Sequence, residues 1–168
     1  MMRSRSNKIT TCAAFTALGL ILGYIETFMV IPINVPGIRI GLANIITVLC
    51  LYTIGPAYTA TVLFLRITLS AVLFGSPVSF AYSLTGAVAA FFGMLMMKRL
   101  GFSIYGVSFC GAILHNIFQT TVAYFMVRSI YVFSYLPVLI LWGAFAGLLI
   151  GFLADMMNRR LGNIITGG

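Results

Sequence analysis

A single charged residue, Arg66, lies within the apolar run from Ala60 to Phe74. The guanidinium group stays protonated in proteins, and holding it near the centre of a bilayer costs about 3 kcal/mol or more. A membrane helix therefore carries an arginine where the side chain faces a polar cavity or a partner. Because a guanidinium group binds carboxylate and phosphate oxygens in a bidentate manner, Arg66 indicates a site for an anionic substrate. A purely structural ion pair, or a contact with backbone carbonyls, is the alternative.

Glu26 is one of only two acidic residues in the chain, and Asp155 is the other. With a rise of 1.5 Å per residue, a helix that starts near Ile9 carries Glu26 about 25 Å along its axis. This predicts a position in the outer third of the membrane. Glu26 is either a structural partner of Arg66 or Arg39, or a direct ligand of the substrate. The two roles are compatible, because a paired site can still contact a substrate.

The segment 34–44 is the most polar connection between apolar runs, and it contains Arg39, Gly41 and Asn44. Glycine allows the backbone to approach a ligand closely, and a helix N-terminus favours anions. Arg39 and Asn44 are therefore candidate substrate-binding residues. An ordinary turn with an interfacial arginine is the alternative.

A third polar group consists of His115, Asn116 and Gln119. His115 and Gln119 are four residues apart, so they share one face of a helix, and Asn116 is adjacent. One histidine with two amides is a poor metal site, and we expect no metal here. Hydrogen bonding to a substrate is one interpretation, and a hydrogen bond to a neighbouring helix is the other.

The composition places these residues in a membrane protein. Of the 168 residues, 61% are hydrophobic and only 7% are charged, whereas a soluble domain usually has about 25% charged residues. We predict an all-α integral membrane protein that forms a single transmembrane domain over residues 1–168. Prolines, glycines and basic pairs separate six predicted transmembrane helices, at about 9–31, 41–54, 57–74, 78–97, 103–127 and 134–156.

The distribution of basic residues predicts the orientation. With the N-terminus inside, the cytoplasmic side receives Arg3, Arg5, Lys8, Lys98, Arg99, Arg159 and Arg160. The outer side receives only Arg39 and Arg128. By the positive-inside rule, both termini are then cytoplasmic, and the location is the cell membrane.

Small residues at four-residue spacing mark two helices. Ala13 and Ala17 lie near the N-terminus, and Gly143, Gly147 and Gly151 lie near the C-terminus. Such pairs let a second helix approach closely in lipid. For both sets we weigh a partner interface against packing within the chain, and we expect the glycines to pack within the chain.

Three segments, residues 37–45, 65–77 and 115–119, resemble the Gx transporter family, which is also described as heptaprenyl diphosphate synthase component I. The resemblance extends from about residue 8 to 158. That family is similar to the S components of energy-coupling factor (ECF) transporters. S components are six-helix membrane proteins that capture a vitamin or a precursor and dock on a transmembrane coupling protein driven by two ATPase subunits.

The resemblance implies a role for Ala13 and Ala17 in docking on the coupling protein. It also implies a substrate pocket near the outer face, with Glu26, Arg39 and Asn44 around it and Arg66 and His115 at its floor. The substrate is expected to be small and anionic, and related to flavin, quinone or isoprenoid metabolism. The chain contains no G-x-x-x-x-G-K-[ST] loop, so partner ATPases must supply the energy.

The alternative is a membrane accessory subunit, component I, of heptaprenyl diphosphate synthase. Prenyl synthases hold Mg²⁺ on the diphosphate with clusters of acidic residues. Glu26 and Asp155 are far apart in sequence and predicted on opposite sides of the membrane, so they cannot form such a cluster. We therefore predict no catalytic residues, no cofactor, no nucleic acid partner and no enzymatic activity of the chain alone.

Overall fold

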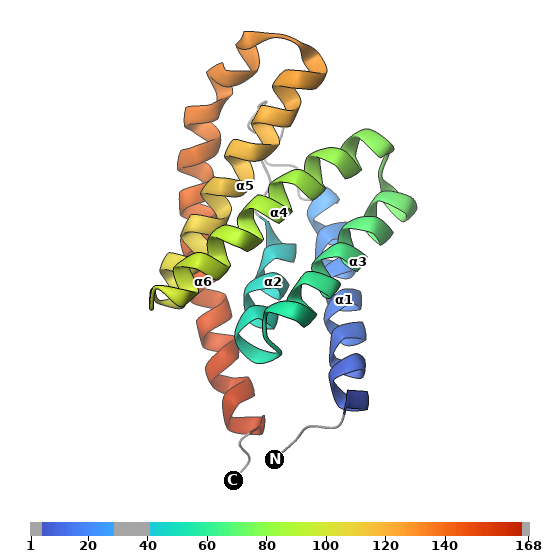
Figure 1. Cartoon of the computed structure of the whole chain (residues 1–168), viewed down its shortest axis with the longest axis vertical. Helices are drawn as coiled ribbons and strands as arrows, with labels where there is room; N and C mark the ends of the chain where they lie inside the picture. Colours follow the sequence, from blue (N-terminus) through green and yellow to red (C-terminus); the bar gives the residue numbers. More distant parts are fainter. Residues whose placement is uncertain (1–4, 29–40, 166–168) are drawn as a thin grey trace.

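The computed structural model of the chain describes residues 5–28 and 41–165. Within these ranges the structure is entirely helical, without a strand. The elements are α1 (Arg5–Phe28), α2 (Leu42–Thr53), α3 (Pro56–Phe74), α4 (Pro77–Arg99), α5 (Ile104–Val127), the 3-10 helix η1 (Ile130–Tyr135) and α6 (Leu136–Ile165). Figure 1 shows them as an elongated bundle in which α4 crosses the others diagonally.

Local sequence explains where the helices begin. Pro56 and Pro77 occupy the first turns of α3 and α4, where a missing N–H costs nothing. Ser76 and Ser79 form a reciprocal capping box at the start of α4, and the Ser103 side chain caps α5. The described helices follow the predicted ranges within a few residues, except that α6 continues past 156 to Ile165. An Asp155–Arg159 ion pair of 3.0 Å, four residues apart, supports this added part of α6.

Four segments of the described chain are long and apolar enough to cross a membrane, namely 8–26, 56–74, 77–99 and 130–160. The chain is thus an all-helical protein with several candidate membrane spans. Two of the six predicted spans do not belong to this group. Helix α2 is apolar but has only 12 residues, and α5 carries His115, Asn116 and Gln119.

Helix α2 is short and lies inside the bundle. Its residues Val48, Leu49, Cys50 and Leu51 are fully buried, and α1, α3 and α6 pack around it. A helix that is apolar on every side is buried in a large core or a membrane. Figure 1 shows α2 between α1 and α6. Helix α2 is therefore part of the core that positions its neighbours.

The helices alternate in direction along the bundle. Lys8 of α1 lies over the ring of Tyr58 in α3, and Lys98 of α4 donates a hydrogen bond of 2.5 Å to the carbonyl of Leu51 in α2. Near the same end, the Tyr105 hydroxyl of α5 lies 3.1 Å from Asp155 of α6. The first residues of α1, α3 and α5 and the last residues of α2, α4 and α6 thus share one end.

We call this end the basic end, because it gathers most of the described basic side chains, Lys8, Lys98, Arg99, Arg159 and Arg160. The opposite end, which we call the Glu26 end, contains the last turn of α1, the start of α2 and the α3–α4 connection. The start of α1 and the end of α6 both lie at the basic end (Figure 1). The membrane orientation of these two ends stays a prediction. Arg3 and Arg39 lie outside the described residues.

Glycines in α6 pack against α5, as expected from their spacing. A Cβ atom on Gly147 would lie 3.0 Å from Cα of Phe109, and one on Gly151 would lie 2.9 Å from Cα of Tyr105. Gly143 similarly meets the side chain of Asn116. The prediction that this glycine series packs within the chain is therefore confirmed.

Candidate substrate-binding site

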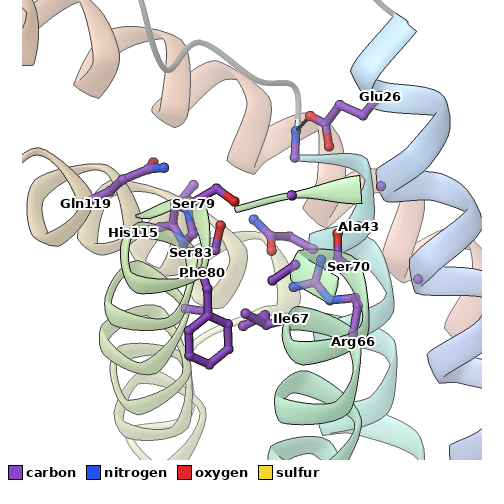
Figure 2. Close-up of a pocket in the computed structure, with 18 of the residues that line it drawn as sticks. Glu26, Ala43, Arg66, Ile67, Ser70, Ser79, Phe80, Ser83, His115 and Gln119 are labelled. Carbon is purple, nitrogen blue, oxygen red and sulfur yellow. Dashed lines mark hydrogen bonds between the residues drawn. The ribbon is translucent and has the colours of Figure 1, made fainter. Parts of the chain in front are cut away.

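A cavity of about 160 Å³ lies among all six α-helices, between the middle of the bundle and the Glu26 end. Its apolar lining comes from Ile67, Phe74, Phe80 and Ile150, among other residues. The polar part of the lining consists of Glu26, Asn44, Arg66, Ser70, Ser79, Ser83, His115, Asn116 and Gln119. Figure 2 shows Arg66 and Ser70 on the α3 side, and Ser83, His115 and Gln119 across from them on α4 and α5. A polar cavity enclosed by apolar helices is a strong indication of a ligand site.

Arg66 is the only Lys or Arg residue in the described lining of the cavity, which also contains His115. Its side chain is partly buried, and its Nε atom is buried without a hydrogen-bond partner among the described residues. A buried N–H of a guanidinium group that has no acceptor is costly, and such groups in native proteins usually have a functional reason. Because Arg66 lines the cavity, an anionic ligand there would bind its guanidinium group through nitrogen atoms other than the enclosed Nε.

Gly19 of α1 creates the space for this side chain. A Cβ atom on Gly19 would lie 2.7 Å from Cδ and 3.4 Å from Cγ of Arg66. Any larger residue at position 19 would therefore displace the arginine stem. The close approach of α1 to α3 explains how the fold places Arg66 at the cavity wall.

Glu26 does not form an ion pair with Arg66; the one ion pair within the described parts of the chain joins Asp155 and Arg159. The Glu26 carboxylate instead accepts a hydrogen bond from the backbone N–H of Gly41, directly before α2. Gly41 has φ of +79°, a left-handed conformation that favours glycine. Glu26 thus connects the end of α1 with the start of α2 at the edge of the cavity (Figure 2).

Several hydroxyl and amide groups face the cavity. The Ser70, Ser83 and Gln119 side chains form no hydrogen bond with other described residues, so they can bind a ligand. The Ser79 hydroxyl is less available, because it donates to the carbonyl of Ser76 and accepts from the backbone N–H of Ser76.

Asn116 has a structural contact as well as a place in the lining. Its Nδ2 atom donates a hydrogen bond of 2.6 Å to the carbonyl oxygen of Leu139 in α6. His115 packs closely against α4, since a Cβ atom on Gly86 would lie 3.0 Å from its Nδ1 atom. Both residues therefore help to hold α5 in place, and both line the cavity.

Six of the seven predicted substrate-binding residues meet at this cavity: Glu26, Asn44, Arg66, His115, Asn116 and Gln119. The seventh, Arg39, lies outside the described residues. The predicted docking residues Ala13 and Ala17 are exposed on the outer face of α1, away from the cavity lining.

The sequence analysis did not identify Gly19, Ser70 or Ser83. A signal existed for Ser70, which follows Arg66 by four residues and so shares its helix face. Ser79 and Ser83 are four residues apart on α4, and neither was identified from the sequence. No signal in the sequence could identify Gly19, because its role depends on how closely α1 approaches α3.

The described residues do not support metal chemistry. Within them, no group of three or more His, Cys, Asp or Glu side chains is placed to hold a metal ion. Asp155 is engaged by Tyr105 and Arg159 at the basic end, far from Glu26. The described site can therefore bind and orient a ligand, and it offers no acidic cluster for prenyl transfer.

Comparison with known proteins identifies the family. The sequence profile of a family described as Heptaprenyl diphosphate synthase component I matches residues 15–157, which is most of the chain. No curated protein and no solved structure shows significant similarity to the chain. The family assignment confirms the prediction that the chain is not itself an enzyme. On the basis of this match, the chain belongs to the Heptaprenyl diphosphate synthase component I family.

Proposed function

We propose that the chain is a membrane subunit that binds a small anionic substrate in the cavity around Arg66. The observation that carries this proposal is the place of Arg66 in the lining of a polar cavity that is enclosed by apolar helices. A structural arginine in a membrane would have its donors satisfied by carboxylates or carbonyls. The hydroxyl and amide groups of the cavity supply further contacts to a ligand.

The specific role that we propose is that of an S component of an ECF-type importer. The cavity lies toward the Glu26 end, and the predicted orientation places this end outside, where an importer captures its substrate. The exposed small residues Ala13 and Ala17 offer a flat surface on α1 for a coupling protein. Two ATPase subunits bound to that coupling protein would supply the energy, and the described helices offer no nucleotide-binding loop of their own.

A second candidate is a membrane accessory subunit of heptaprenyl diphosphate synthase, and the family description favours it. In this role the chain would recruit a soluble catalytic subunit with acidic motifs to the membrane. The cavity would then hold a polar group of the substrate or product, and the apolar outer surface would contact its lipid tail.

Copurification separates the two candidates. The tagged chain, extracted from its native membrane in mild detergent, should bring down a transmembrane coupling protein and two ATPase subunits if it is an S component. It should bring down a soluble prenyl synthase if it is an accessory subunit. Recovery of the synthase without an ATPase would overturn the importer proposal and leave the binding role of the cavity intact.

A further inference from the structure

We infer that the cavity selects a small carboxylate with a single negative charge and a neutral hydrogen-bonding group on its far side. This inference rests on the proposed binding function and narrows its substrate class. Three features of the described residues carry it: the size of the cavity, its charge, and the distribution of its polar groups.

The volume of the cavity favours a small bound group. About 160 Å³ is close to the size of an apolar protein cavity that accepts one benzene ring, and most pockets for larger ligands exceed about 300 Å³. The three fused rings of a flavin are larger than this space. A ligand with one ring, or a short chain of similar size, fits.

The charge of the lining limits the charge of the ligand. Arg66 is the single Lys or Arg residue in the described lining, and the Glu26 carboxylate lies at its edge. A diphosphate would bring several negative charges to one guanidinium group, and the described residues offer no site for a metal ion that could compensate for them. An uncompensated charge in a low-dielectric site is strongly unfavourable. One carboxylate matches the planar fork of Arg66 in both charge and geometry.

The opposite wall can both donate and accept hydrogen bonds, and its described residues include no carboxylate, Lys or Arg side chain. Ser83 of α4 and Gln119 of α5 lie there, across the cavity from Arg66 (Figure 2). Ile67 of α3 and Phe80 of α4 contribute apolar surface to the lining. A suitable ligand has a carboxylate at one end for Arg66, an apolar middle for the apolar lining, and a hydroxyl group at the other end for Ser83 or Gln119.

Binding of three probes of similar size tests this inference. The probes are 4-hydroxybenzoate, its neutral isostere 4-hydroxybenzamide, and inorganic diphosphate without added metal; benzoate, which lacks the hydroxyl group, is added for the variants. Binding to the detergent-purified full chain is measured by calorimetry. We expect 4-hydroxybenzoate to bind roughly tenfold to a hundredfold more tightly than the amide, which is the range for a charge-assisted hydrogen bond.

Variants test whether Arg66 contacts the carboxylate of the ligand and whether Ser83 contacts its hydroxyl group. Arg66→Gln should abolish the preference for the carboxylate, whereas Arg99→Gln, which changes an exposed arginine at the basic end, should keep it. Ser83→Ala should weaken 4-hydroxybenzoate more than benzoate. Thr61→Ala, on the exposed face of α3, should weaken neither.

Three results would overturn the inference: tighter binding of diphosphate, equal binding of acid and amide, or no binding of 4-hydroxybenzoate. These results differ from failure of the proposed function. If the purified protein still retains a specific anionic molecule of another class, and loses it on Arg66→Gln, the binding function stands and only the carboxylate class is wrong.

Discussion

Gly19 of α1 and Arg66 of α3 pack so closely that a single Cβ atom on Gly19 would lie 2.7 Å from Cδ of the arginine. Real Cβ contacts are not this short, so the absent side chain of Gly19 fixes the path of the Arg66 stem. The cavity geometry therefore depends on a residue that has no functional group of its own.

Gly19→Ala tests this dependence. Alanine is a better helix former than glycine by about 1 kcal/mol, so the helix itself is not weakened. The added methyl group should push the guanidinium away from its place and reduce ligand affinity at least about tenfold, a change worth about 1.4 kcal/mol. Gly106→Ala in α5 is the matched control, because its Cβ atom would meet only ordinary contacts with Phe102. Equal affinity in both variants would show that Arg66 tolerates the displacement.

Arg66→Met separates a binding role from a structural one. Because Nε of Arg66 has no partner within the described structure, replacing it with an apolar side chain of similar length removes a desolvation cost. We expect the variant to unfold at the same temperature as the wild type or higher, with a gain of up to about 2 kcal/mol, and to lose ligand binding. Thermal unfolding in detergent measures the first property and calorimetry the second. A fall in the unfolding temperature would assign Arg66 a structural role.

Glu26→Ala tests the connection between α1 and α2. The variant leaves the N–H of Gly41 without its carboxylate acceptor, and a hydrogen bond to a charged group contributes about 1.5–3 kcal/mol. We expect lower stability and faster exchange of hydrogen at the start of α2, measured by mass spectrometry. Glu26→Gln keeps an acceptor oxygen, so it should lose less stability than Glu26→Ala. If both variants exchange like the wild type, the Glu26–Gly41 contact does not hold this edge of the cavity.

The two alanines on α1 test the importer role directly. Ala13→Leu combined with Ala17→Leu adds bulk to an exposed helix face without touching the cavity lining. Substrate uptake by cells should fall severely, while ligand affinity of the purified protein stays unchanged. Ala57→Leu, an exposed position at the start of α3, is the control. Normal uptake by the double variant would exclude this face as the docking surface.

Particular residues show how far the sequence could predict the structure. The helix boundaries followed from local signals such as Pro56, Pro77 and the basic pair Lys98–Arg99, which act within a few residues. The polar candidates, including Arg66 and Gln119, were recognisable because polar groups are rare in apolar helices. Their meeting at one cavity follows from the alternating directions of the helices.

Other features required the three-dimensional packing. The sequence left open whether Arg66 pairs with Glu26, and in the structure Glu26 binds the backbone of Gly41 instead. Two polar groups on different helices can each have several partners, and only the register of the helices decides between them. The central position of the short helix α2 likewise depends on contacts between helices that are distant in sequence.

The most direct test of the binding site is mass spectrometry of the small molecules that the detergent-purified protein retains, with wild type and Arg66→Gln compared at equal amounts of folded protein. We predict that the wild type retains a specific anionic molecule and that the variant loses it. Retention of the same molecule by both proteins, or of no specific molecule by either, would contradict the assignment of the Arg66 cavity as the substrate site.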